Sequence, residues 1–481
     1  MEGGARFDVI VVGCGAAGLA AATAFAEHAQ DKPKPRTVLI LERSSKEQRG
    51  GATRWTGAFL RITENRKLDP DWADRVKRVS GGLANYDYCK KLEQETPGTL
   101  KFIEERGVNI LFPEFPFAHT FGDEKDPGVQ PPGMPDGGGL AIVEALCGRL
   151  EKMSNVTFKY ETEALELKTD SEGAVDGLLI RESSGKTQSI EAGAVVLACG
   201  GFEGNPEMLT RYLGSKACDL PLIAPGIANN RGDGHRMAMS LGADVAGQFD
   251  MIHAEPVDRR TGKADAVIYT YTGGIFVNGK AKRFYDEGNA TWDNTFELVG
   301  YEIWKNQNQE AYWIADAKTT QVEGWDMGYL SDVPPETADT IEELAEKLGL
   351  DPASLRASVD EFNAAAHDGP FVPDAVDGKS TTGLTPPKSN WAVRLDEGPF
   401  IGMPLTAAIC FTYGGIRTDL HGRVVTPNGV PIPNLYAAGE LTGLFYHEYP
   451  PATSVLRSLT FGRIAGAHAA ATMPDLADAV T

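Results

Sequence analysis

A glycine-rich turn near the start of the chain has the spacing of a phosphate-binding loop. It reads Gly13-Cys14-Gly15-Ala16-Ala17-Gly18, with glycines at its first, third and sixth positions. Gly13 permits a tight turn, Gly15 lets the backbone approach a pyrophosphate, and Gly18 lets a helix pack close to a strand. Free N–H groups at the start of that helix would favour an anion. The chemistry expected here is the binding of a dinucleotide.

The elements that must position this turn flank it in the order of a Rossmann unit. The apolar run 7–12 predicts a strand, and the alanine-rich stretch 19–28 predicts a helix. A second apolar run, 36–41, predicts another strand and ends at Glu42. A carboxylate there can accept hydrogen bonds from ribose hydroxyls and would repel a 2′-phosphate. The alternative is a bare βαβ turn without a ligand, but the complete set of elements favours nucleotide binding.

A second part of the signature lies near the other end of the chain. Residues 434–440 read NLYAAGE, a predicted strand that runs into a glycine-acid turn, and 461–466 read FGRIAG at the start of a helix of small residues. This ending resembles flavoproteins of the glutathione reductase type, in which the late strand and helix contact the flavin end of FAD. The resemblance therefore favours FAD over NAD. It implies an α/β fold with a Rossmann-like FAD-binding domain.

The composition is that of an ordinary soluble protein with a large core. The chain has 481 residues, of which 42% are hydrophobic and 23% charged, enough for two or three domains. The net charge of −21 argues against nucleic acid and anionic membranes as partners, although a local basic pocket could still bind an anionic substrate. The six cysteines show no CxxC spacing, so we expect no metal site and a reducing compartment. No apolar run reaches the ~18–20 residues of a membrane span, and we expect a cytoplasmic protein.

The residue pattern divides the chain into three segments. Residues 1–250 predict the first part of the FAD-binding domain. Residues 251–395 carry more Trp, Asn, Asp and Glu and predict an inserted α+β cap domain. Residues 396–481 return to strand and turn patterns and predict the second part of the FAD-binding domain. The nucleotide-binding domain is thus expected to be discontinuous.

Motifs over nearly the whole chain resemble the flavoprotein family that contains fumarate reductase, succinate dehydrogenase, 3-ketosteroid Δ1-dehydrogenase and tricarballylate dehydrogenase. They are VIVVGCGAAGLAAA (9–22), RGGATRWTG (49–57), LACGGFEGN (197–205), RGDGHRMAMSLGA (231–243), GGIFVNGKAKRFYDEG (273–288), YGGIRTD (413–419), LYAAGELTGLFYHEYP (435–450) and FGRIAG (461–466). The resemblance implies FAD under a cap and hydride transfer at flavin N5. Covalent members carry a histidine in the glycine-rich loop, and 50–57 has none, so noncovalent FAD is expected.

The resemblance also assigns residues to the track from adenosine to flavin. They are Gly13, Gly15, Ala17, Gly18, Glu42, Arg43, Gly50, Gly51, Ala52, Thr53, Thr56, Gly57, Gly200, Gly201, Asp233, Glu440, Ser454 and Leu456.

Departures from the family patterns bear on the substrate. Fumarate reductases supply an arginine proton donor soon after the RF-x-x-E motif, but the stretch 288–293 has no arginine. The histidine expected before the glycine pair is missing from 411–415, and the aromatic stretch 445–449 replaces a substrate-binding arginine. Fumarate chemistry is therefore disfavoured. The FYHEYP segment is more similar to the tricarballylate and ketosteroid branch.

In that branch a Tyr-Pro-Gly segment lies beside the substrate carbonyl, which makes Tyr449 the expected hydrogen-bond donor to an enolate. Pro451 follows where the branch has glycine, and it has no N–H to donate. Tyr413 and His447 are candidates for the base. His253 lies where the family often has a substrate-side histidine. Each of the last three has a structural alternative: packing for Tyr413, backbone hydrogen bonding for His447 and a cap hinge for His253.

The expected activity is FAD-dependent desaturation beside a carbonyl or carboxylate. The substrate would be a small ketone or carboxylic acid, cyclic compounds included. A donor would stabilise the enolate, a base would take the α proton, and the flavin would take hydride from the β carbon. An enoate reductase running the reverse reaction is one alternative, and a catalytically idle electron-relay flavoprotein is another. The sequence leaves the external electron acceptor open among oxygen, a quinone and a redox protein.

Overall fold

A mostly parallel sheet built around β1 forms one half of the molecule. The computed structural model describes residues 6–28, 35–120 and 133–473. The sheet has the order β16-β17-β8-β1-β2-β5, and β7 and β6 continue antiparallel from β8. Its strands are β1 (Arg6–Val12), β2 (Val38–Leu41), β5 (Val156–Lys159), β6 (Thr162–Thr169), β7 (Val175–Glu182), β8 (Thr187–Leu197), β16 (Arg423–Val425) and β17 (Pro431–Ala437).

The central strands of this sheet are buried on both faces. β1 runs parallel to β2 and β8, and the side chains of Val9, Ile10 and Val11 are fully buried. Strands covered on both faces read as continuous apolar runs, which is why 7–12 and 36–41 could be predicted as strands. β2 begins at Val38, two residues later than predicted, and the Thr37 N–H donates to the Asp8 carboxylate instead of to the backbone of a neighbouring strand.

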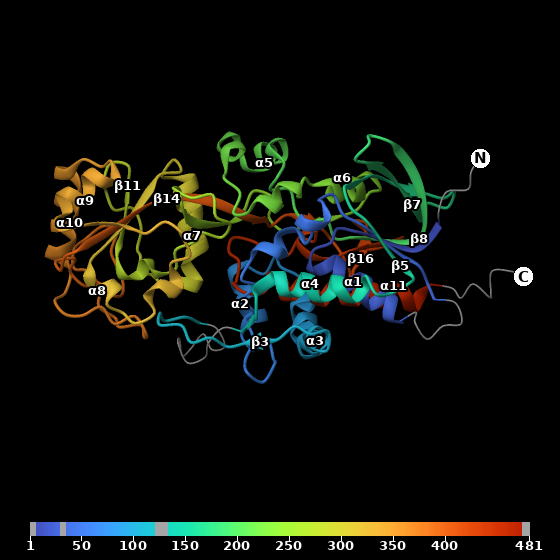
Figure 1. Ribbon diagram of the computed structural model, residues 1–481, viewed down its shortest axis with the longest axis horizontal. Helices are drawn as coiled ribbons and strands as arrows, with labels where there is room; N and C mark the ends of the chain where they lie inside the picture. Colours follow the sequence, from blue (N-terminus) through green and yellow to red (C-terminus); the bar gives the residue numbers. More distant parts are fainter. Residues whose placement is uncertain (1–5, 29–34, 121–132, 474–481) are drawn as a thin grey trace, which may run out of the picture.

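Helices α1 (Ala16–His28) and α11 (Ser454–Thr472) lie side by side against this sheet, although they come from opposite ends of the chain (Figure 1). Glycines of α11 make the close approach possible. A Cβ on Gly462 would lie 2.2 Å from the Ala17 oxygen, and one on Gly466 would lie 2.1 Å from the Ala21 oxygen. The two ends of the nucleotide signature are thereby held together.

A second sheet forms the other half of the molecule, at the left in Figure 1. Its order is β10-β14-β12-β11, with β13 pairing to β14. Its strands are β10 (Ile252–Asp258), β11 (Ile275–Asn278), β12 (Ala311–Ala315), β13 (Glu336–Ala338) and β14 (Phe400–Thr412), and its helices are α7 (Trp292–Lys305), α8 (Ala317–Thr320), α9 (Ile341–Leu348) and α10 (Pro352–Ala365). β14 belongs to this sheet although it follows residue 395, so the domain boundaries given above stay a prediction.

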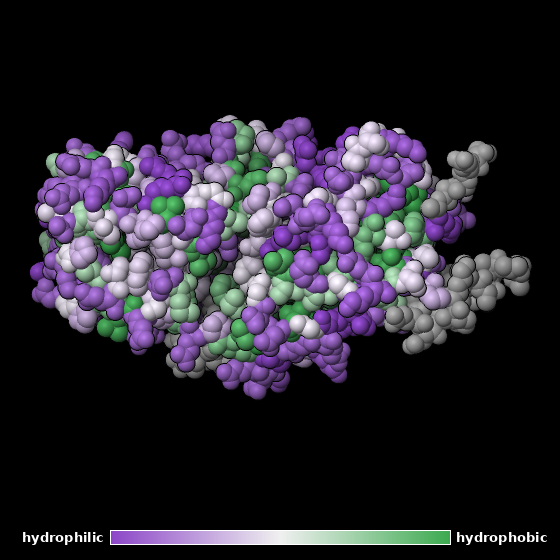
Figure 2. Space-filling model, viewed as in Figure 1, coloured by the Kyte–Doolittle hydropathy of each residue, from purple (hydrophilic) through white to green (hydrophobic). Residues whose placement is uncertain are grey.

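The remaining elements cover the first sheet and link it to the second. They are α2 (Trp72–Val79), α3 (Tyr86–Glu104), β3 (Ile110–Leu111), β4 (Met134–Pro135), α4 (Gly138–Leu150), α5 (Pro206–Leu213), α6 (Asp233–Ser240), β9 (Val245–Ala246) and β15 (Gly415–Ile416). The α/β class with an inserted α+β unit is confirmed. On the face in Figure 2, hydrophilic residues cover most of the surface and hydrophobic ones form small groups. Within the described residues no helix has the length and apolarity to cross a bilayer.

Replacing Gly466 by alanine is expected to destabilise the fold, because the added methyl group would enter the α1 backbone. Overpacking of this kind costs about 1–3 kcal/mol, which thermal unfolding of Gly466→Ala would measure. The matched control is Gly148→Ala in α4, where nothing lies within 4 Å of the added Cβ. That change should raise stability by ~1 kcal/mol through helix propensity. Equal stability of the two variants would contradict this account of the helix contact.

Candidate active site

One long pocket begins at the glycine turn between β1 and α1. Gly13 has φ +106°, and a Cβ on it would lie 2.3 Å from the Ala198 oxygen. A Cβ on Gly18 would lie 2.0 Å from the Gly13 oxygen, so this glycine brings α1 close to the strand. Gly15 differs, because its nearest neighbours would be 3.6 Å from a Cβ. Its backbone therefore borders open space, which fits the approach of a pyrophosphate.

Glu42, at the end of β2, is held beside this turn. Its carboxylate accepts a hydrogen bond from the Cys14 N–H at 3.0 Å and another from the Ser44 N–H at 2.8 Å. The next residue, Arg43, forms an ion pair with Asp233 at the start of α6. All three predicted residues, Glu42, Arg43 and Asp233, line the pocket. The turn and the acid thus stand together as a dinucleotide site requires.

Most of the predicted cofactor residues line this pocket and a few lie behind its wall. The lining includes Gly13, Gly15, Ala17, Glu42, Arg43, Gly51, Ala52, Thr53, Thr56, Gly57, Gly200, Asp233, Glu440 and Ser454, whereas Gly18, Gly50, Gly201 and Leu456 lie outside it. Gly201 makes room for Glu440, because a Cβ there would lie 2.0 Å from Oε1 of that carboxylate. The residues of this end therefore fit FAD in both spacing and shape.

Glu440 belongs to a pair of buried carboxyl groups. Its Oε1 accepts the Thr412 N–H at 3.0 Å, and the Asn230 amide donates to both Glu203 and Glu440 at 3.2 and 3.4 Å. Burial and then the neighbouring Glu440 raise the pKa of Glu203 well above its ordinary value. Burial also raises the pKa of Glu440. Both shifts favour a proton on the pair, because two bare carboxylates would repel one another.

Aromatic side chains enclose the other end of the pocket, which we call the chamber. Its walls include Tyr269, Trp292, Phe296, Phe411 and Tyr449. The Tyr269 and Trp292 rings lie 4.6 Å apart, and the Phe411 and Tyr449 rings meet edge to face at 5.0 Å. Such walls suit a flat apolar substrate.

A bulge between β10 and β14 shapes the wall of the chamber. His253 pairs with Phe411 and Ala254 pairs with Ile409, so Cys410 is an extra residue on β14. Bulges turn side chains out of the regular alternation of a strand. Cys410 and Phe411 consequently both line the pocket.

His253 lies between two carboxylates. Its Nε2 contacts Glu255 at 2.9 Å and its Nδ1 contacts Glu297, on α7, at 3.0 Å. Burial alone would lower the pKa of His253, but the hydrogen bonds with Glu255 and Glu297 raise it to about 9. Both ring nitrogens then donate protons. Ligand atoms of His253, Glu255 and Cys410 lie within 4.8 Å of one another, but both ring nitrogens of this histidine already contact carboxyl groups.

Glu297 also connects Tyr413 and Tyr449 to this histidine. It accepts hydrogen bonds from the Tyr413 hydroxyl and, at 3.1 Å, from the Tyr449 backbone N–H. Burial raises the pKa of Glu297, and burial and then Glu297 raise the pKa of Tyr413. Tyr413 is fully enclosed and lies outside the pocket lining. Its hydroxyl points to Glu297 instead of the chamber.

The four predicted catalytic residues therefore fall in two groups. Tyr449 and His253 line the chamber. Tyr413 lies behind its wall, and His447 is exposed, with its backbone N–H donating to Gln248. Only the first two could touch a substrate in this arrangement.

The Tyr449 hydroxyl has an unusual set of partners. Its oxygen accepts the backbone N–H groups of Thr453 at 2.8 Å and Ser454 at 2.9 Å, at the start of α11. A phenolic oxygen has two lone pairs, so both are engaged. The hydroxyl proton is the one bonding capacity left, and no hydrogen bond to an acceptor in the described residues uses it.

The sequence analysis missed most of the aromatic walls and, among the polar residues of the chamber, Glu255, Asp265 and Tyr269. Burial and then Glu255 raise the pKa of Asp265 to about 7. Glu255 could have been found, because acids are rare in buried strands and it stands two residues after His253, on the same face of β10. No pattern in the sequence marks Asp265 or Tyr269, whose loop reaches the chamber only in the folded protein.

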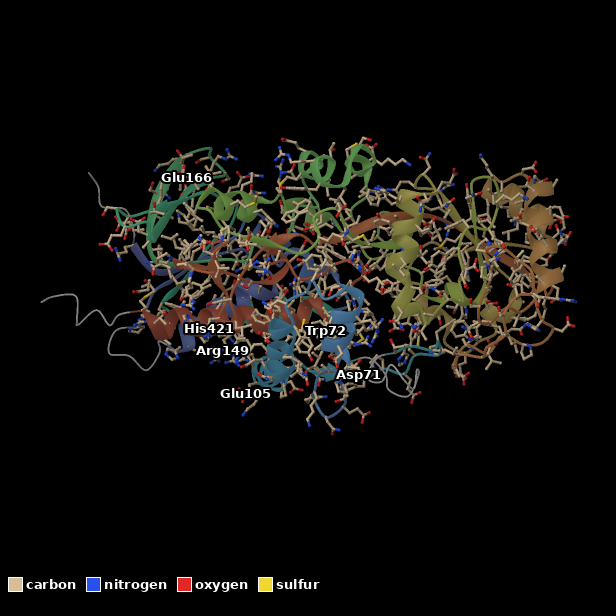
Figure 3. All side chains as sticks on the ribbon, turned by 180° about the vertical axis from the view of Figure 1, so that it is seen from behind. Asp71, Trp72, Glu105, Arg149, Glu166 and His421 are labelled. Atoms are coloured by element: carbon tan, nitrogen blue, oxygen red, sulfur yellow. The ribbon has the colours of Figure 1, made fainter. Side chains whose placement is uncertain are left out.

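A second hollow lies outside α3 and α4, between Glu105 and Arg149, which are labelled in Figure 3. Its arginines are already paired, since Arg106 and Arg149 both bind Glu27. This hollow is a surface feature lined by residues that form ion pairs, and it does not enclose a ligand. The long pocket is therefore the candidate site.

Comparison with known proteins points to the same pocket chemistry. A family model described as FAD binding domain matches residues 8–455. Urocanate reductase of Eggerthella lenta is 27% identical and covers 96% of this chain and 74% of its own, and vinyl phenol reductase of Lactiplantibacillus plantarum is 26% identical over 96% of each. The 3-ketosteroid-Δ4-(5α)-dehydrogenase of Rhodococcus jostii RHA1, solved with 4-androstene-3,17-dione, superposes with a TM-score of 0.70 at 26% identity and covers 97% of both chains.

The raised pKa of His253 predicts a loss of stability in alkali. A histidine with a folded pKa of about 9 and an unfolded value near ~6.5 stabilises the fold fully below that lower value. The contribution, ~3 kcal/mol, disappears as the pH rises to about 9. The stability difference between wild type and His253→Gln should therefore shrink from pH 6 to pH 10 in thermal unfolding. His447→Gln, at an exposed histidine, should run parallel to wild type, and parallel curves for His253→Gln would contradict the assignment.

Proposed function

Because the chain belongs to the FAD binding domain family, we propose that its pocket is the active site of a desaturase that introduces a C=C bond beside a carbonyl group. The broader statement, that it is an FAD-dependent oxidoreductase acting on CH–CH bonds, follows from the family and the named relatives. Bound FAD supplies the two-electron acceptor for a hydride. Reoxidation falls to an external acceptor: oxygen, a quinone or a redox protein.

The Tyr449 hydroxyl carries this proposal. Its oxygen accepts two backbone N–H groups, and the residue lines the chamber, so its proton can be donated to a ligand there. A donor fixed in this way can bind a substrate carbonyl and stabilise the negative charge that develops when an α proton leaves. Because the start of α11 holds the Tyr449 side chain in place, its hydroxyl group does not have to move during the reaction.

Asp265 is the group to which we assign the α proton. It lines the chamber, and its pKa of about 7 suits a base that works near neutral pH. Glu255 stands in a different environment, against the positively charged His253. Two carboxyl groups with such unequal surroundings commonly have unequal roles. Tyr413 and His447 do not line the chamber, and we give them no contact with the substrate.

The reverse reaction, reduction of an activated C=C bond, is the second candidate. Relatives that cover 96% of the chain, such as urocanate reductase and vinyl phenol reductase, are named reductases. The same residues would serve, with Asp265 giving a proton instead of taking it. The chamber contains a hydrogen-bond donor, Tyr449, and an acid, Asp265. Both support an enzyme, in either direction of the reaction, over a catalytically idle electron-relay protein.

The direction can be tested on the purified holoenzyme under anaerobic conditions. Mixing oxidised enzyme with saturated cyclic ketones should bleach the flavin if the protein is a desaturase. Mixing reduced enzyme with the matching enones would restore the flavin colour if it is a reductase. Absence of both changes over the panel would reject the proposal.

Replacing Tyr449 by phenylalanine should slow flavin reduction by roughly tenfold or more, the scale for loss of one oxyanion donor. FAD content should stay unchanged, as measured by the absorbance of the purified protein. Tyr446→Phe is the matched control, because its hydroxyl also accepts a backbone N–H, from Gly247 at 2.9 Å, but lies outside the chamber. An unchanged rate in Tyr449→Phe would remove this residue from the mechanism.

The rate of flavin reduction should rise with pH through about 7, because Asp265 accepts a proton only in its ionised form and its pKa is about 7. Asp265→Asn should lower the rate ~10²–10⁴-fold, the usual effect of losing a general base, and should abolish this dependence. The exposed Asp374→Asn controls for the change of charge. A pH profile that survives in Asp265→Asn would assign the proton to another group.

A further inference from the structure

One oxygen of Glu255, in the wall of the chamber, has no hydrogen-bond partner within the described part of the chain. Its Oε1 contacts His253, whereas Oε2 is buried and has no hydrogen bond within the described part of the chain. The residue is only 8% exposed and lines the pocket. The Cys410 thiol lies nearby, but a thiol is a weak donor. A buried carboxylate oxygen without a strong donor is costly, which indicates that a ligand completes this site.

The surrounding charges leave the chamber negative. Two carboxylates, Glu255 and Glu297, share the single positive charge of His253. Glu297 is satisfied by three donors, from His253, Tyr413 and the Tyr449 backbone. Glu255, which contacts His253 through one oxygen and leaves the other without a hydrogen bond in the described residues, is the less compensated carboxyl group of the two. Low polarity within the aromatic walls strengthens the resulting field.

The described pocket lining holds no lysine, and its two arginines are engaged elsewhere. Arg43 binds Asp233 and Glu163 beside the glycine turn. Arg457 donates to the backbone oxygens of Thr442 at 2.9 Å and Gly439 at 3.3 Å. A carboxylate in the chamber would meet Glu255 and Asp265, whereas the His253 imidazole beside them is already paired with two carboxyl groups. This argues against the carboxylic acids that the sequence left open as substrates.

We propose that Glu255 determines specificity by binding a cationic nitrogen group, so that the substrate is a flat carbonyl compound that also carries a basic nitrogen. This rests on the proposed function, since it places Tyr449 on the carbonyl and Glu255 on the nitrogen within one chamber. The rings of Tyr269, Trp292, Phe296 and Phe411 line the same space. Aromatic faces attract organic cations, so these rings add to the preference for a cationic substrate.

The test compares two probes of the same shape and opposite charge. Benzamidine, a flat cation at neutral pH, and benzoate are titrated into the oxidised holoenzyme, with calorimetry and the flavin difference spectrum as readouts. We expect benzamidine to bind at least 100-fold more tightly than benzoate. In Glu255→Gln, benzamidine affinity should fall at least tenfold while benzoate affinity does not fall, the scale of a lost charge-assisted hydrogen bond.

The exposed Glu448→Gln is the matched control, because it removes one carboxylate next to Tyr449 but outside the pocket. It should leave both affinities unchanged. Equal binding of benzamidine and benzoate to the wild-type protein would overturn the proposal. This comparison needs no variant, so it remains decisive even if Glu255→Gln misfolds. Unchanged benzamidine affinity in a folded Glu255→Gln would also overturn it.

The proposed function can fail separately from this inference. If no ketone or enone changes the flavin but the probes bind as expected, the chamber selects cations and the desaturase proposal is wrong. If Glu255→Gln abolishes flavin reduction while benzamidine affinity stays the same, Glu255 is the base and the inference is wrong.

Discussion

The imidazolium of His253 between two buried carboxylates is the contact on which the chamber depends. It joins β10, which carries His253 and Glu255, to Glu297 on α7. Through Glu297 it also reaches the Tyr413 hydroxyl and the Tyr449 backbone. Without the central positive charge, two enclosed carboxylates would repel each other across the wall of the site. The position of Tyr449 and the charge offered to a ligand both follow from this one arrangement.

The nucleotide end could be predicted from sequence because its requirements are local. Gly13 needs a positive φ, Gly18 needs a missing Cβ, and Glu42 needs only to follow the second strand. These conditions are met within about thirty residues of chain. The fold class followed in the same way, since strands buried on both faces give unbroken apolar runs.

The chamber could be predicted only in part, because its chemistry arises between segments far apart in the chain. Tyr449 was found through a family motif, but its donor-only hydroxyl depends on the start of α11. Tyr413 was a candidate base, but in the structure its hydroxyl donates to Glu297. Asp265 acquires its raised pKa from burial and from Glu255. No local pattern encodes such contacts, and the bulge at Cys410 shifts the strand alternation on which a prediction would rely.

The path of β14 has a mechanical consequence. The strand has thirteen residues, roughly 43 Å at the usual rise, and runs unbroken from the outer edge of the second sheet to Thr412, whose N–H binds Glu440 at the cofactor end. β10 is hydrogen-bonded along it. The two strands pair from Leu405 to Thr412, so the part of β14 nearest the cofactor end is double-stranded. Movement of the second sheet would have to bend both strands together, which favours exchange of substrate through side chains and surface loops.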